Sequence, residues 1–191
     1  NRDRLLDAVA KDEAETGRVH PASHLVFTRG MGDISIGELI KEQLCEQDTA
    51  GRWRPRYHPD AARVIHLDPG ATLDAYGFVM GCASGDVIVT RRVGESQMDE
   101  AAPMVFIDLM LRIIAPKGSE VDFGTIRALI RELREWGFGI ELVTEDTWQS
   151  IDNQQRLKDA GFAVADLSVD ATEEPYNALK LALDEGRLRL Y

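Results

Sequence analysis

The chain has 191 residues, 44% of them hydrophobic, and this length and composition suit one domain with a substantial apolar core. Its formal net charge of −11 argues against a broadly basic surface for nucleic acid, because contacts to phosphates depend on Lys and Arg. No run approaches the ~20 consecutive apolar residues of a membrane span, and the charged first residues are not those of a signal peptide, so we expect a cytoplasmic protein.

The first 60 residues predict a lead-in segment with short helices, and residues 61–191 predict the main domain. One of these helices is expected over residues 36–46, where apolar side chains recur at helical spacing. The basic and aromatic run 52–57 could contact DNA, but we favour the interpretation that it ties a connecting segment to the domain.

Four apolar runs follow the lead-in segment, and they predict an antiparallel meander of strands. Turn signals separate them at Pro69-Gly70, at Ser84-Gly85 and over the polar stretch 94–102. The expected strands cover residues 63–68, 75–82, 87–93 and 105–114.

The apolar period then changes to that of alternating helices and strands. Asp122 is placed to cap a helix that ends before Gly137, and a buried strand is expected over 139–144. The remaining expected elements are a helix over 150–160, a strand over 162–167 and a helix over 175–186. This order is that of a ribonuclease H-like α/β fold: an antiparallel meander followed by parallel strands in one mixed sheet, flanked by helices.

Two strands of this prediction end in acidic residues. The strand 64–68 delivers Asp68 beside a turn, and the strand 140–144 is followed by Glu145 and Asp146. If the two strands are neighbours, Asp68 and Asp146 meet. Adjacent carboxylates repel each other unless a divalent cation lies between them, and two Mg²⁺ ions about 4 Å apart are a common device for phosphodiester hydrolysis.

Each of these residues also has a plainer interpretation. Asp68 and Asp146 suit turn or helix N-cap roles, and Asp74 could add a third oxygen ligand or hold a turn through its side chain. His66 shares a strand face with Asp68, where packing against the sheet is a simpler role than binding a metal. Cys45 has neither metal-site spacing nor companions, and the same is true of the other cysteine, Cys82, so reduced thiols are expected.

Several stretches form a series in a definite order along the chain. The most specific is the Asp-x-Trp-Gln-Ser element of residues 146–150, which follows an apolar strand. The others are residues 64–68 with 74–81, 106–113, 126–139, 167–170 and 175–188. Over residues 63–191 the chain thereby resembles the nuclease domain of the large terminase subunit, part of the DNA-packaging motor of tailed phages.

The resemblance implies a metal-dependent endodeoxyribonuclease that cuts concatemeric viral DNA during genome packaging. It implies Asp68 and Asp146 as catalytic metal ligands for two Mg²⁺ or Mn²⁺ ions, one activating a water and the other stabilising the leaving oxygen. Asp74 and Glu145 are further candidate ligands. Candidate DNA-binding cations are Arg91, Arg92 and Lys117, with Arg127 and Arg131 also near the expected cleft.

The same resemblance implies partners and a cellular setting. Double-stranded DNA, the terminase ATPase domain, the small terminase subunit and the portal protein are the expected partners, in the cytoplasm of a host bacterium. The family draws a third catalytic Asp from a segment that would follow Tyr191, and its phosphate-binding loop for ATP has no counterpart here. We therefore expect the C-terminal part of the domain to be missing and cutting by this chain to be weak.

Two other functions fit the same sequence. Ribonuclease H-like folds host many nucleic-acid cleavages, so a transposase, a resolvase or a ribonuclease is an alternative that RNA hybrids or junction DNA as substrates would reveal. A non-catalytic module that docks to the portal or the small terminase subunit through its acidic surface is the other alternative. Tight portal binding without metal binding would favour it.

Overall fold

The computed structural model describes residues 36–69, 76–94, 96–114, 121–146, 151–168 and 172–190. Contacts divide the chain into two units, Asn1–Gln43 and Leu44–Tyr191. The predicted helix near residue 36 is confirmed as α3 (Ile36–Leu44), on which Ile40 is buried. No helix within the described ranges is long and apolar enough to cross a membrane.

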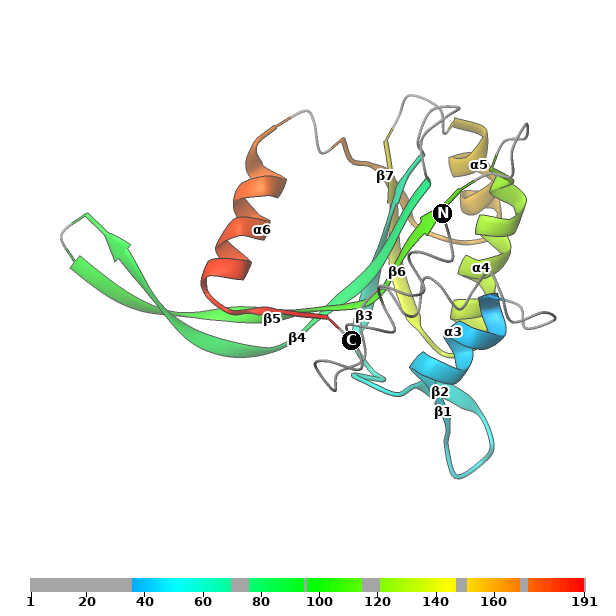
Figure 1. Cartoon of the computed structure of the whole chain (residues 1–191), viewed down its shortest axis with the longest axis horizontal. Helices are drawn as coiled ribbons and strands as arrows, with labels where there is room; N and C mark the ends of the chain where they lie inside the picture. Colours follow the sequence, from blue (N-terminus) through cyan, green and yellow to red (C-terminus); the bar gives the residue numbers. More distant parts are fainter. Residues whose placement is uncertain are drawn as a thin grey trace, which may run out of the picture. The chain divides into compact units, whose positions relative to one another are not determined.

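The larger unit is a mixed α/β structure whose six-stranded sheet is flanked by helices (Figure 1). Its elements are β1 (Cys45–Gln47), β2 (Trp53–Pro55), β3 (Ala62–Asp68), β4 (Tyr76–Val93), β5 (Ser96–Ile113), α4 (Phe123–Glu135), β6 (Gly139–Glu145), α5 (Ile151–Asp159), β7 (Val164–Asp166), α6 (Glu174–Asp184) and β8 (Leu188–Leu190).

The strand order of the large sheet is β7-β6-β3-β4-β5-β8. Strands β3, β4 and β5 form an antiparallel meander, while β6 pairs parallel to β3, and β7 pairs parallel to β6. The last strand, β8, pairs parallel to β5. An antiparallel meander followed by parallel strands is therefore confirmed, and β3 is the strand that joins the two halves.

One face of the sheet is buried against helices. On β3 the burial alternates with a period of two, so Ile65 and Leu67 are fully buried whereas Val64 and Asp68 are exposed. Helix α4 covers the buried face with an apolar stripe at helical spacing: Ile126, Leu129, Ile130 and Leu133. Figure 1 shows α4 and α5 on one side of the sheet and α6 on the other.

The ends of α4 follow the sequence signals closely. The Asp122 side chain accepts a hydrogen bond from the Gly124 amide at 2.7 Å, which caps the first turn as predicted. The helix gives way to Gly137, which has a positive φ of 87°. A Cβ atom at residue 137 would lie 3.1 Å from the Trp53 carbonyl oxygen, so β2 packs directly on this turn.

The run 52–57 is held in place within the larger unit by such contacts. Strand β2 pairs antiparallel with β1, and Arg54 forms an ion pair with Glu46 at 2.7 Å. The Arg56 guanidinium donates to the Cys45 carbonyl oxygen at 3.0 Å. The positive charges of this run thus serve local contacts, in line with the favoured interpretation of a connecting segment.

The turn predicted at 84–85 is wrong, and the one predicted over 94–102 is limited to its start at Gly94, because the chain forms one long two-stranded arm there. Strand β4 continues through Ser84-Gly85 by a bulge between Ala83 and Asp86, and Gly85 adopts a φ of 70°. Strand β5 already begins at Ser96, opposite Val93. The sequence of this segment resembles that of a turn because both strands of the arm, residues 86–103, carry mostly exposed side chains.

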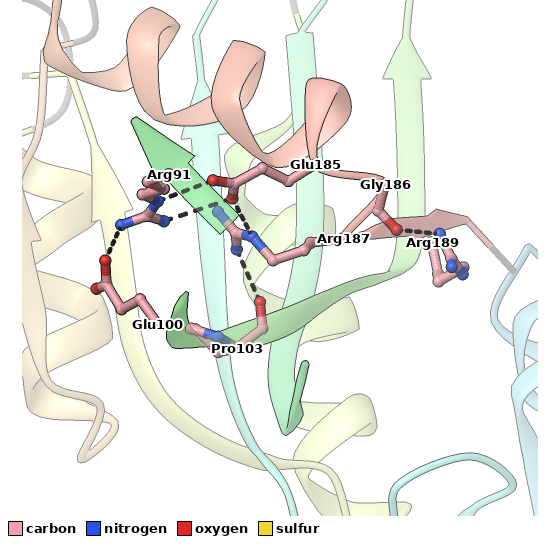
Figure 2. A network of polar contacts seen from close by, with 7 residues as sticks. All are labelled: Arg91, Glu100, Pro103, Glu185, Gly186, Arg187 and Arg189. Carbon is pink, nitrogen blue, oxygen red and sulfur yellow. Dashed lines mark hydrogen bonds and ion pairs between the residues drawn. The ribbon is translucent and has the colours of Figure 1, made fainter. Parts of the chain in front are cut away.

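The arm is joined to the C-terminal segment by a network of charged groups (Figure 2). Glu185, just after α6, accepts hydrogen bonds from Arg91 at 2.8 Å and from Arg187 at 2.6 Å. Arg187 also donates to the Pro103 carbonyl oxygen at 2.7 Å, and Arg91 reaches across the arm to Glu100. The two arginines hold the pKa of Glu185 below its usual value, chiefly through the hydrogen bond from Arg91.

A second charged group lies wholly inside the larger unit. The Arg63 side chain is fully buried and forms an ion pair with Asp108 at 3.3 Å. It also donates to the carbonyl oxygens of Tyr57 and Ala61, and its guanidinium lies 4.9 Å from the centre of the Phe138 ring. Arg63 therefore links β3, β5, the lead-in segment and the start of β6.

A backbone irregularity brings Asp108 to this position. Met80 pairs with Leu109 and Gly81 with Ile107, which leaves Asp108 as the extra residue of a bulge in β5. A Cβ atom at residue 81 would lie 2.6 Å from the Phe106 carbonyl oxygen, so only glycine fits beside this bulge. Burial raises the pKa of Asp108, and Arg63 counteracts that effect.

We predict that Arg63→Met lowers the free energy of unfolding by about 3–5 kcal/mol, because it leaves Asp108 buried without its cation. The double variant Arg63→Met/Asp108→Leu should regain a large part of the loss, since it removes the stranded charge as well. Urea unfolding of Arg63→Met, Asp108→Leu and the double variant measures the coupling energy between the two side chains. A single variant that loses less than about 1 kcal/mol would contradict the assigned role of the pair.

We further predict that Glu185→Ala loosens the arm without unfolding the sheet. The substitution removes the acceptor shared by Arg91 and Arg187, so amide hydrogen exchange over residues 86–103 should become several-fold faster. Glu174→Ala, an exposed acidic position at the start of α6, is the matched control and should leave these rates unchanged. Equal arm exchange in the two variants would show that the network does not brace the arm.

Candidate metal-binding edge of the sheet

Asp68 and Asp146 lie at the same edge of the sheet, as the sequence predicted. Strand β3 pairs parallel with β6, and the register matches Leu67 with Glu145, so the next residue of each strand is an aspartate. Asp68 is exposed and Asp146 is half-buried. The neighbouring strands of a parallel pair thus deliver two carboxylates to one accessible place.

Space beside Asp68 depends on a glycine in the next strand. Gly77 on β4 is the register partner of Asp68. A Cβ atom at residue 77 would lie 3.2 Å from the Asp68 Cβ atom and 3.8 Å from one of its carboxylate oxygens. A larger side chain would therefore press against Asp68 and restrict the positions open to its carboxylate.

His66 faces both aspartates from within the sheet. Its Nδ1 atom lies 2.9 Å from the Thr144 hydroxyl oxygen, and that hydroxyl donates to the Ile65 carbonyl oxygen at 3.3 Å. Burial lowers the pKa of His66 below its usual value, although Asp68 and Asp146 each act to raise it. The half-buried histidine is thus held by Thr144 next to the two carboxylates.

Asp146 is oriented by a residue that the sequence analysis did not single out. The Ser168 hydroxyl, just after β7, donates to one Asp146 carboxylate oxygen at 3.0 Å. Asp166, near the end of β7, is the register partner of Glu145 and accepts a hydrogen bond from the Gln154 side chain at 2.6 Å. The pairing of β7 with β6 was the signal that could have placed Ser168 beside Asp146.

Glu145 lies on the other, helix-covered face and is fully buried. The Asn153 side chain donates to both of its carboxylate oxygens at 3.0 Å, and Arg127 in turn donates to Asn153 at 2.7 Å. The Tyr76 hydroxyl is close enough to lower the Glu145 pKa, although no well-aligned hydrogen bond joins it to any described residue. Burial dominates and raises the pKa of Glu145 to about 7.

This geometry separates the candidate metal ligands into different environments. Within the described ranges, no group of three or more His, Cys, Asp or Glu side chains is arranged to hold a metal ion. Asp68 and Asp146 offer carboxylate oxygens on the accessible face of the sheet. The Glu145 carboxylate lies on the opposite face, where it accepts hydrogen bonds from Asn153. Asp74 lies outside the described residues, and its role as a ligand stays a prediction.

The cations predicted to bind DNA lie in different surroundings. Arg91 sits in the arm, 14 residues along β4 from Gly77, which corresponds to roughly 45 Å of strand, and it is engaged by Glu100 and Glu185. Arg92 is exposed, and its guanidinium donates to the Gly94 carbonyl oxygen at 3.2 Å. Lys117 lies outside the described residues. Neither described arginine is near the two aspartates, and their DNA-binding role stays a prediction.

The edge of the sheet therefore presents an accessible carboxylate pair beside a histidine and a serine. Oxygen ligands of this kind suit hard divalent cations such as Mg²⁺ and Mn²⁺. Comparison of the chain with protein-family models, with curated proteins and with solved structures gives no match. The chemistry of the site rests on its own residues.

We predict that Glu145 makes stability depend on pH in a defined direction. Its pKa is about 7 in the folded chain against 4.5 for an ordinary glutamate, so the folded chain binds more protons between these values. The stability that this group contributes is complete below pH 4.5 and is lost as the pH rises through 7. Relative to Glu145→Gln, the natural chain should lose up to about 3 kcal/mol across this window.

The measurement is urea unfolding of both proteins from pH 4 to pH 8, with EDTA present so that metal ions play no part. Glutamine keeps an oxygen that can accept from Asn153, and it carries no charge to bury. Asp86→Asn, an exposed position on the arm, is the control and should follow the natural chain. Parallel pH profiles for the natural chain and Glu145→Gln would contradict the assigned environment of Glu145.

Proposed function

We propose that this chain is a metal-dependent endodeoxyribonuclease domain with a ribonuclease H-like fold, of the kind found in the large terminase subunit of tailed phages. The observation that supports it is the parallel pairing of β3 with β6, which brings Asp68 and Asp146 together. The reaction would be hydrolysis of phosphodiester bonds in double-stranded viral DNA during packaging.

The strand order supports the proposed fold family. Three antiparallel strands in sequence, with two further strands added in parallel beside the first, make the arrangement expected of a ribonuclease H-like sheet. The carboxyl ends of β3 and β6 lie at one edge, where ligands commonly bind in sheets of this type. Fold alone does not specify an activity, so the acidic pair has to support the chemistry.

The residues present fit a divalent cation. Asp68 and Asp146 supply carboxylate oxygens, the ligand type that hard divalent cations prefer. When bound, Mg²⁺ or Mn²⁺ would supply an activated water and stabilisation of charge on the phosphate oxygens. Ser168 orients the Asp146 carboxylate, and Gly77 leaves room beside Asp68.

The negative charge of the chain constrains how it would meet DNA. A net charge of −11 repels a polyanion, and association would be slow and sensitive to salt. Delivery by other parts of a packaging motor would overcome this repulsion. We propose the terminase ATPase domain, the small terminase subunit and the portal protein as those partners, in the cytoplasm of a host bacterium.

Cleavage of supercoiled plasmid with Mn²⁺, Mg²⁺ or EDTA tests the proposed activity. We expect nicking that EDTA abolishes, and we expect Asp68→Asn or Asp146→Asn to lower it by more than about 100-fold. Asp86→Asn changes the same chemical group far from the site and should cut normally. A form extended beyond Tyr191 should be assayed beside this chain, because the terminase family that it resembles takes a third catalytic Asp from such a segment.

Calorimetric titration with Mn²⁺ gives a second readout that does not depend on cutting. If Asp68→Asn and Asp146→Asn each weaken Mn²⁺ binding and Asp86→Asn does not, the result supports the assigned ligands. Cutting of RNA hybrids or branched junctions in preference to plasmid would point to another ribonuclease H-like nuclease. Absence of cutting and of metal binding, in the extended form as well, would overturn the proposed activity and leave a docking module.

A further inference from the structure

Helices α4 and α5 border an open groove on the helix-covered side of the sheet. Its volume is about 460 Å³, and residues of both helices and of the turn after α5 line it. The lining residues are Gly124, Arg127, Arg131, Arg156, Asp159 and Ala160. Three arginines and one aspartate line the groove, so its lining has a net positive charge in a chain whose net charge is −11, and the carboxylates of Asp122 and Asp152 lie close to Arg127.

The arginines of α4 are placed where an anion would be expected. Arg127 and Arg131 are four residues apart, so they lie on one helix face and repel each other. Gly124, one turn before Arg127, also lines the groove, and its amide donates to the Asp122 carboxylate at 2.7 Å. Arg131 is exposed, and within the described residues it forms no ion pair.

The arginine of α5 is also accessible. Arg156 forms an ion pair with Asp152 at 2.7 Å, but both side chains are more than half exposed, and such pairs contribute little. Asp159 accepts a hydrogen bond from Gln155 at 2.8 Å. A ligand with its own negative charge could therefore recruit Arg156 at small cost.

We propose that this groove binds phosphates of a nucleic-acid backbone. Arginine suits the task because its planar guanidinium donates several hydrogen bonds to phosphate oxygens. From Arg127 to Arg131 the helix rises by roughly 6 Å, a span that matches about two nucleotides along a strand of duplex DNA. Cations spread along two helices match successive phosphates better than one small anion.

The groove is connected to the acidic edge through the interior. Arg127 donates to Asn153, which donates to Glu145, the residue next to Asp146. Both helices begin at the carboxyl end of the sheet, where Phe123 of α4 contacts the Tyr76 ring at 5.6 Å between centroids. A nucleic acid held by the groove and cut at Asp68 and Asp146 would pass over this end of the sheet. In this form the inference rests on the proposed nuclease function.

Binding of a fluorescent 20-base-pair duplex, measured by anisotropy in EDTA between 50 and 200 mM salt, tests the proposal. Arg131→Gln/Arg156→Gln should bind at least about tenfold more weakly at low salt, and its dependence of log K on log salt should be shallower by about 2. Arg52→Gln is the matched control, because Arg52 also forms an exposed ion pair four residues away, with Asp48. Its salt dependence should equal that of the natural chain.

The outcomes separate this inference from the proposed activity, because EDTA prevents metal-dependent cutting. Weaker binding by the double variant, with Asp86→Asn binding normally, would support the groove even if plasmid cutting were absent. If the natural chain cuts plasmid but the double variant binds duplex equally well, the groove does not bind DNA and the proposed activity is unaffected. A natural chain that binds no duplex at 50 mM salt would overturn the groove too. Thermal unfolding confirms that each variant is folded.

Discussion

The structure depends on the central position of β3, which pairs antiparallel with β4 and parallel with β6. A strand with partners on both sides has its register fixed twice, and a slip by one residue would turn its buried face toward solvent. Ile65 and Leu67 face the helices, so His66 and Asp68 are obliged to face the other way. The same pairing obliges Asp146 to follow β6 at the level of Asp68. The acidic edge is thus a consequence of how the core is packed.

The two ends of β3 use charge in opposite ways. At its start, Arg63 is buried and neutralised by Asp108, and its remaining donors are satisfied by backbone carbonyl groups. At its end, Asp68 is exposed and lies beside a second carboxylate. Burying a charge stabilises a fold only when its partners are complete, whereas an accessible pair of like charges favours an external cation. The buried ion pair at the start of β3 therefore stabilises the fold, whereas the accessible carboxylates at its end are where a reaction could take place.

Much of this fold could be predicted from periodicity and capping. Asp122, Gly137 and the apolar stripe of α4 are local signals, and each predicted the element that the structure contains. The long arm could not be predicted, because its strands pair with each other rather than with a core, and their polar sequence imitates a turn. At the acidic edge, Asp68 and Asp146 were identifiable as strand-end residues. Ser168, Asn153 and the buried state of Glu145 depend on contacts between distant segments, and nothing in the local sequence specifies them.

The arm also bears on whether strands of another molecule could pair with this chain. Beyond the short pairing of β5 with β8, the described strands of the arm have no further neighbours, so both of its outer edges present backbone groups that another strand could use. Such edges promote aggregation unless charges or prolines interrupt them. Asp86, Arg92 and Asp99 supply charges along this ribbon, and Pro103 lacks an amide donor at its base. The charged residues that make the arm resemble a turn in the sequence therefore disfavour pairing of its exposed edges with another molecule.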